Sequence, residues 1–295
     1  MGRNIVNMTK AEFIQLIGKL SEKFPPKPVL GFNITETDTG LFDCKMGGMP
    51  YFPKNMEYPV SRWKDDAGTP MKLLVQLNFE KIPHIEDFPE KGILQIFIDA
   101  SADAEGNFGM CESDCLTQNS YRVIYHENII TDESQLMTPD DLPEIPVDEE
   151  VGCPFEADSE FLLEPKKPEN DCLDCSLAGF DEAFIEAYKA ETGKELESMY
   201  DLEISDEKID WWRIIGEMQP DIGDAFIGGY PRFVQSDPRG YIENVSDCDT
   251  VLFESISTDD EAIMWCDCGT GVFLIPRENL KKLDFSKVMY SWDCC

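Results

Sequence analysis

The sequence predicts an α+β protein that is mainly antiparallel β-sheet, of roll-like form, with helices at its periphery. Short apolar runs bounded by glycine, proline and aspartate recur in two stretches, 31–131 and 223–295. No helical pattern separates consecutive runs within either stretch, which favours antiparallel pairing. The 295 residues are 42% hydrophobic and 11% aromatic, so the chain has enough apolar surface for a core.

An amphipathic helix is predicted near the start, within residues 1–30. Thr9 and Glu12 have the spacing of a capping box. Apolar residues then recur on one helical face until two prolines end the run: Phe13, Leu16, Ile17, Leu20 and Pro25-Pro26. We expect this helix to cover one side of a sheet.

The first β-unit, 31–131, contains three predicted strands. They are Leu73–Phe79, Gly92–Ile98 and Tyr121–Tyr125. Because the run from Ile93 to Ile98 is almost continuously apolar, we expect that strand to be buried on both faces.

Residues 132–222 are predicted to form an acidic and helical insertion. Its first part, 132–175, carries 15 Asp and Glu residues against two lysines, which is typical of a solvated loop or linker. Within it, Val147–Phe155 is expected to form an edge strand, because charges and proline protect sheet edges from mispairing.

Two helices are predicted after this acidic part. Asp181 is expected to cap a helix that Gly193 ends. A shorter helix is expected within Asp206–Met218. The second β-unit, 223–295, then returns to strands, predicted at Thr250–Ile256, Ala262–Cys266 and Gly271–Ile275.

The two β-units share a Gly-Gly-x-Pro segment. In each unit an apolar strand follows it, and a second strand begins with glycine 44 or 42 residues after the second glycine of the pair. This parallel order predicts an internal duplication. No Lys-Ser/Thr or helix follows to bind phosphate, so we interpret the segments as tight turns with positive φ, with structural turn residues Gly47, Gly48, Pro50, Gly228, Gly229 and Pro231.

Several segments taken together resemble the YwqG-like proteins: Lys45–Pro53, Val75–Phe79, Phe88–Gln95, Tyr121–Tyr125, Ile227–Pro231, Gln235–Arg239, Asp284–Val288 and Ser291–Cys294. The resemblance runs from about residue 10 to the end and is poorest in the acidic middle. That family is bacterial, mostly cytosolic and classed as a domain of unknown function. The resemblance implies one domain over 1–295, with a mainly-β, roll-like fold, peripheral helices and an intertwined duplication. It implies no catalytic residues.

Charge excludes several classes of partner. With 59 acidic against 25 basic residues the formal net charge is −34, so the chain lacks the basic surface that nucleic acids or anionic membranes require. No window is apolar for long enough to form a membrane helix, and no signal-peptide core is recognisable. We therefore expect a cytoplasmic protein whose 11 cysteines are thiols.

Catalytic and cofactor motifs are scarce. The two histidines, His84 and His126, accompany no Gly-x-Ser-x-Gly elbow, and no nucleotide-binding motif occurs, so no cofactor is expected. Zinc would require Cys172 and Cys175 to meet Cys266/Cys268 or Cys294/Cys295 in space. The loop 101–112 has acidic residues at EF-hand positions but Ser101 at the first, and a predicted strand before it. An EF-hand is rejected, a non-helical cation loop stays open, and no metal site is assigned.

Two classes of function remain. The first is a non-catalytic binding protein whose acidic surface, around 132–175, meets a basic protein, a basic peptide or a cation. The alternative is a carboxylate-based hydrolase, with or without a metal. The scarce histidines and missing cofactor motifs favour the first, and enzymatic activity stays undecided. The candidate binding residues are Asp237, Arg239, Trp265 and Asp267; Arg239 is expected to pair with a buried carboxylate in a structural role.

Overall fold

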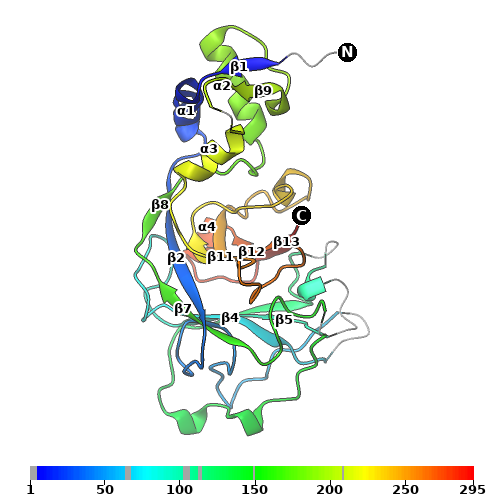
Figure 1. The fold of residues 1–295 in the computed structure, drawn as a ribbon. Coiled ribbons are helices and arrows are strands. Elements are labelled where there is room, and N and C mark those ends of the chain that lie inside the picture. The colour runs from blue at the N-terminus through cyan, green and yellow to red at the C-terminus, as the bar shows by residue number, and fades with distance from the viewer. Residues whose placement is uncertain (1–4, 64–67, 102–106, 112–114, 149, 208) are drawn as a thin grey trace.

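Most strands belong to one 11-stranded antiparallel sheet that curls into a half-barrel (Figure 1). The computed structural model describes the 295-residue chain apart from 1–4, 64–67, 102–106, 112–114, 149 and 208. Along the sheet the strands follow the order β13 (Met289–Asp293), β12 (Thr270–Ile275), β11 (Thr250–Ile256), β10 (Ala225–Gly228), β2 (Lys27–Glu36), β7 (Glu160–Pro165), β3 (Lys45–Gly47), β4 (Lys72–Asn78), β5 (Ile93–Ile98) and β6 (Tyr121–His126), and β8 (Glu169–Asp171) pairs with β2.

The curl brings the two outer strands of the sheet together. The rings of Tyr121 in β6 and Tyr290 in β13 lie 5.4 Å apart between centroids. The Tyr121 hydroxyl donates to the carbonyl of Val288 at 2.5 Å, and the Tyr290 amide donates to the carbonyl of Cys115 at 3.0 Å. The concave face therefore encloses the main hydrophobic core, to which strands from both β-units contribute.

The central strands of the two β-units are fully buried. All residues of β4, β5 and β12 are buried, and β11 is buried except at its ends. This confirms the prediction that Ile93–Ile98 has two buried faces. Both strand pairs contain a register shift, between Leu73 and Val75 in β4 and between Val251 and Phe253 in β11.

A smaller helical lobe lies at one end of the sheet (Figure 1). It contains β1 (Val6–Met8), α1 (Lys10–Lys19), α2 (Phe180–Thr192), β9 (Leu202–Ile204) and α3 (Trp211–Met218), while the short α4 (Arg277–Leu280) precedes β13. The strands β1 and β9 pair in parallel, unlike those of the main sheet. In the described residues no helix has both the length and the apolar character needed to cross a bilayer.

The first helix packs differently from what its sequence led us to expect. Its capping box is confirmed, since Thr9 and Glu12 bond to each other's backbone amides. However, its apolar face meets α2 and α3 instead of the sheet, with Phe13 against Phe184 at 5.2 Å between ring centroids. The amphipathic pattern indicated a buried face, and the pattern alone does not identify the neighbour.

Three local predictions are corrected. The second helix begins after Gly179, whose φ of 80° sets the N-cap, so Asp181 lies in the first turn; Gly193 ends the helix as expected. The described residues of Val147–Phe155 form no strand, because the Asp148 carboxylate accepts the amides of residues 150 and 151 and turns the chain. The strand of this region is β7, which lies inside the sheet between β2 and β3. Ala262–Cys266 is likewise an irregular loop, in which the amides of Ala262 and Ile263 donate to the side chains of Asp260 and Thr258.

Both Gly-Gly pairs adopt left-handed backbone conformations. The φ angles are 67° and 66° at Gly47 and Gly48, and 71° and 69° at Gly228 and Gly229. A Cβ on Gly47 would lie 2.5 Å from the Ser159 carbonyl oxygen, and one on Gly228 would lie 2.4 Å from that of Pro28. Each pair therefore requires glycine for both conformation and space. The internal duplication itself stays a prediction.

Candidate functional site

A hollow of about 1130 Å³ opens beside the loop 147–160, between the end of β2 and the loop 261–266. We call it the acidic groove. None of its described lining residues is lysine or arginine, and eight carry carboxylates: Glu36, Asp38, Asp148, Glu150, Glu156, Asp158, Glu160 and Glu261. Five of these come from the acidic stretch 132–175, and the other three come from distant parts of the chain.

Part of the groove's acidic wall is held by hydrogen bonds. The Thr39 hydroxyl donates to Glu160 at 2.6 Å, and the Ser159 hydroxyl donates to Glu36 at 2.8 Å. At the edge of the groove, the segments around the end of β2 and the start of β7 are therefore joined by side-chain hydrogen bonds in addition to the backbone pairing of the two strands. Glu156, Asp158 and Glu261 are exposed to solvent.

Two lysines lie close to the groove but bond to main-chain carbonyls. The Lys72 ammonium donates to the carbonyl of Ala157 at 2.7 Å, behind the ring of Phe155. The Lys45 ammonium donates to the carbonyls of Gly40 and Met49, and burial lowers its pKa to about 8. Both lysines thus donate to main-chain carbonyls and not to groove carboxylates, although the charge of Glu160 opposes the lowering of the Lys45 pKa.

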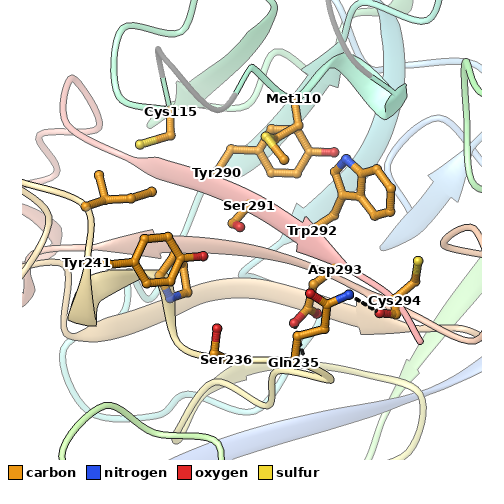
Figure 2. Close-up of a pocket in the computed structure, with 12 residues that line it drawn as sticks. Met110, Cys115, Gln235, Ser236, Tyr241, Tyr290, Ser291, Trp292, Asp293 and Cys294 are labelled. Atoms are coloured by element: carbon orange, nitrogen blue, oxygen red, sulfur yellow. Dashed lines mark hydrogen bonds between the residues drawn. The ribbon is translucent and has the colours of Figure 1, made fainter.

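A second hollow, of about 350 Å³, lies against β13 (Figure 2). We call it the β13 cavity. Its wall is formed by residues from three parts of the chain: Met110, Cys115, Gln235, Ser236, Pro238, Tyr241, Ile242, Tyr290, Ser291, Trp292, Asp293 and Cys294. Two of the segments that carry the family resemblance, Gln235–Arg239 and Ser291–Cys294, thus meet here.

Asp293 holds these two segments together. Its carboxylate accepts the amides of Val234 at 3.2 Å and Gln235 at 2.8 Å, and the Gln235 side chain donates to the Cys294 carbonyl at 2.6 Å (Figure 2). Burial raises the pKa of Asp293, although these amide donors oppose the shift. The carboxylate therefore organises the wall of the cavity through backbone contacts.

The β13 cavity has aromatic walls and few free polar groups. Trp292 and Tyr290 donate their ring N–H and O–H to the carbonyls of Asn107 and Phe108 at 3.1 and 2.8 Å. Its described lining residues include no histidine, so no nucleophile–base pair of the Ser–His type occurs there.

The acidic groove and the β13 cavity share a wall. Phe108 lines the groove, and its ring packs edge-on against Trp292 of the cavity at 5.0 Å between centroids. Cys266 lines the groove and Cys294 lines the cavity, and the neighbouring Cys294 raises the pKa of Cys266.

A family model described as a domain of unknown function (DUF1963) matches residues 44–294. The chain belongs to the DUF1963 family. The matched region includes the whole β13 cavity and most of the acidic groove, while α1 and β2 precede it. No curated protein matches the sequence.

Within the DUF1963 region, Asp237 and Arg239 form a tight pair beside the β13 cavity. Arg239 donates its Nε and Nη2 to the Asp237 carboxylate at 2.9 and 2.6 Å, and its Nη1 to the Cys248 carbonyl at 3.0 Å. Asp237 also accepts the amide of Ala178, from the segment that leads into α2. The side chains are 1% and 14% exposed, so the pair anchors the loop that carries Ser236 and Pro238.

Trp265 and Asp267, the other candidate binding residues, occupy different surroundings. Trp265 is fully buried, donates its ring N–H to the Ser255 hydroxyl at 3.0 Å, and lies so close to Gly271 that a Cβ there would be 2.3 Å from its ring. Asp267 lies in an exposed loop, where its carbonyl accepts the Cys295 amide. Neither residue lines the groove or the cavity.

Sequence reasoning missed two buried carboxylates, Glu254 and Asp171. Burial raises the pKa of both, that of Glu254 well above its usual value. Glu254 accepts the Arg232 amide and the Thr270 hydroxyl, and Asp171 accepts the Tyr230 amide and the Arg232 guanidinium. A glutamate inside the apolar run Thr250–Ile256 was the available signal. Neither carboxylate lines the groove or the cavity, so these perturbed acids do not support the hydrolase alternative.

The cysteines and histidines do not form a metal site in the described part of the chain. No three Cys, His, Asp or Glu side chains are grouped there in a way that could hold a metal ion. The Cys172 thiol bonds to the Met218 carbonyl, next to the helical lobe. Half of the loop 101–112, namely 102–106 and 112, lies outside the described residues. His126 is buried against Gln95, and burial lowers its pKa to about 4.

Proposed function

We propose that this DUF1963 protein is a non-catalytic binding protein whose acidic groove takes a basic segment of a partner protein or peptide. The observation that carries the proposal is the set of eight carboxylates around one hollow with no basic residue among its described lining. Such a concentration of one sign raises the local concentration of opposite charge and accelerates encounter. The chain's net charge of −34 acts in the same direction at longer range.

A polypeptide fits the groove better than a single cation does. A hard cation needs several oxygens converging at about 2.0–2.6 Å, and no such group occurs among the described side chains. The carboxylates instead line an open hollow of about 1130 Å³, which has room for several lysine or arginine side chains. An extended basic segment carries several such side chains, which could each face a different carboxylate of the groove.

We also infer four properties of the chain from its sequence. We infer that the chain is YwqG-like, cytoplasmic and a single domain over 1–295, and that its two Gly-Gly-x-Pro units arose by duplication. Nucleic acids and anionic membranes stay excluded as partners, on the ground of charge. The carboxylate-based hydrolase remains the second class, without an observation that favours it.

The test is peptide binding by fluorescence anisotropy, with a labelled ten-residue Lys/Arg peptide as the probe. In one variant Glu156, Asp158 and Glu261 become Gln, Asn and Gln, which removes three exposed groove charges. The control changes three exposed residues of the helical lobe to Gln, Glu182, Glu186 and Glu197, and so alters the net charge equally. Exposed pairs contribute about 0.2–1 kcal/mol each, so the loss of three should make the groove variant bind about 3-fold to about 150-fold more weakly than the control.

Salt dependence provides the second measurement. Raising the ionic strength to about 1 M shortens the screening length to about 3 Å and should abolish binding to the unaltered protein. Equal affinity of the groove variant and the control would show a diffuse charge effect and would overturn the assignment to the groove. Binding that resists salt would overturn the electrostatic mechanism.

A further inference from the structure

Four cysteines gather at one end of the β12–β13 hairpin. Cys266 and Cys268 precede β12, and Cys294 and Cys295 follow β13. The pairing of Thr270 with Asp293 places Gly269 beside Cys294, where a Cβ on the glycine would lie 2.9 Å from the Cys294 Cβ. The Cys295 amide donates to the Asp267 carbonyl at 3.2 Å. The loop before β12 and the segment after β13 are therefore in contact.

Within this group Cys266 and Cys294 are neighbours. Gly269 lies between them, since a Cβ on this glycine would be 2.4 Å from the carbonyl oxygen of Trp265, the residue before Cys266, and 2.9 Å from the Cys294 Cβ. The Cys266 side chain is exposed and that of Cys294 is half-buried. Cys266 and Cys268 both have left-handed φ angles, 57° and 54°, which residues other than glycine adopt rarely. The backbone of this short loop is thus held in an unusual conformation at the point where Cys266 lies beside Cys294.

We propose that Cys266 and Cys294 are a modification site, at which a peroxide converts the two thiols into a disulfide that joins the wall of the acidic groove to the wall of the β13 cavity. Figure 2 shows Cys294 at the rim of the cavity, next to Asp293. Cys266 reaches the same wall from the groove side. The proposal does not depend on what the groove binds.

The chemistry balances with one hydroperoxide as oxidant. The Cys266 thiolate attacks a peroxide oxygen, the O–O bond breaks, and the departing oxygen takes up a proton, which leaves a sulfenic acid on Cys266. The Cys294 thiolate then attacks that sulfur, the S–O bond breaks, the S–S bond forms, and the hydroxide is protonated to water. Hydrogen peroxide is reduced to two waters by the two electrons and two protons that the thiols lose.

Solvent exposure distinguishes Cys266 from the thiols whose pKa is raised by burial. Burial raises the pKa of Cys44 to about 11 and the pKa values of Cys153 and Cys248 to about 12, so these carry little thiolate at neutral pH. The pKa of Cys266 is raised as well, chiefly by the neighbouring Cys294. Oxidation of the pair should therefore accelerate with pH, about tenfold per unit below that pKa, because the thiolate is the reacting form.

The test is mass spectrometry of the full chain, reduced, desalted, treated with one equivalent of hydrogen peroxide and then alkylated with N-ethylmaleimide. We expect nine alkylated cysteines in place of 11, and a digest in which the peptides containing Cys266 and Cys294 are crosslinked. Cys266→Ser and Cys294→Ser should each abolish this crosslink. Cys268→Ser, in the same loop and also exposed, is the matched control and should keep it.

Three outcomes would overturn the proposal. The first is a crosslink between Cys268 and Cys295 in place of the expected one. The second is loss of the Cys266–Cys294 crosslink in the Cys268→Ser control. The third is oxidation to sulfinic acid without any disulfide. Far-ultraviolet circular dichroism of each variant excludes unfolding as the cause of a lost crosslink.

Discussion

The two Gly-Gly turns of the molecule have the same backbone hydrogen-bond pattern, but the side chains that accept the hydrogen bond differ in charge. In each β-unit the amide three residues after the second glycine donates to a side chain on the following long strand. The Tyr51 amide bonds to Gln76 at 2.9 Å, and the Arg232 amide bonds to Glu254 at 3.1 Å. One unit therefore places a neutral amide, and the other a carboxylate, in the same local role.

The neighbours of these two acceptors differ accordingly. Gln76 receives a second hydrogen bond from Gln95, which in turn bonds to His126, and the low pKa of that histidine keeps the network neutral. Glu254 is fully buried, and the nearest guanidinium, that of Arg232, bonds to Asp171. A buried carboxylate has a large desolvation cost that an amide avoids, so the second turn depends on charge balance and the first does not.

The largest loss of stability is expected when the neutral acceptor of the first turn is replaced by a carboxylate, as in the second turn. In Gln76→Glu a carboxylate would face the carbonyls of Leu41 and Asp43, to which the Gln76 amide group now donates. An uncompensated buried charge costs about 3–5 kcal/mol, so the free energy of unfolding should fall by that amount at neutral pH. Urea denaturation measures it. A loss below about 1 kcal/mol would show that the two turns tolerate charge equally, contrary to the comparison.

Because the two turns share the same backbone geometry, replacing a glycine by alanine should lower the free energy of unfolding equally in both. Gly47→Ala and Gly228→Ala each force a Cβ against a backbone carbonyl at a positive φ, which should cost about 2–4 kcal/mol in either unit. Gly193→Ala is the control, since its φ is 68° and no atom would lie within 4 Å of the added Cβ. It should cost about 1–2 kcal/mol, from the backbone alone. Thermal unfolding of the three variants separates steric from conformational cost, and unequal losses at Gly47 and Gly228 would break the parallel.

The long central strands could be predicted from sequence because their signal is local. β4, β5, β11 and β12 are short apolar runs between turn residues, and each lies within a residue of its predicted start. β2 was not predicted, because Pro28 and Gly31 interrupt its pattern. The structure explains that glycine: a Cβ there would lie 1.8 Å from the Ile222 carbonyl oxygen, in a close approach that depends on the tertiary fold.

The candidate site could be predicted only in part, for a similar reason. The acidic stretch 132–175 stands out in composition, and it supplies five of the groove's carboxylates. Glu36 and Glu261 join them through sheet packing, which no local pattern records. In the same way, the order of the strands in the sheet brings Gln235–Arg239 and Ser291–Cys294 together at the β13 cavity. The sequence therefore indicates which segments carry acidic or polar side chains, but it does not indicate which of these segments lie close together in the fold.

The smallest effect is the reverse exchange, Glu254→Gln, which makes the second turn resemble the first. An amide retains an acceptor for the Arg232 amide and for the Thr270 hydroxyl without the desolvation cost of the charge. Each unit by which folding raises a pKa corresponds to about 1.4 kcal/mol, so at neutral pH the variant should be more stable by at least about 1 kcal/mol.

The pH dependence of that variant tests the cause. Because folding raises the pKa of Glu254, the folded protein binds the proton more tightly than the unfolded chain does. The unaltered protein must then lose stability as pH rises above the unfolded pKa of about 4.3, and the loss continues up to the folded pKa. In Glu254→Gln this part of the slope disappears, so the two proteins should converge in stability below about pH 4. Urea denaturation from pH 4 to pH 8 measures both curves. A constant difference across that range would mean that packing, and not ionisation, distinguishes the two turns.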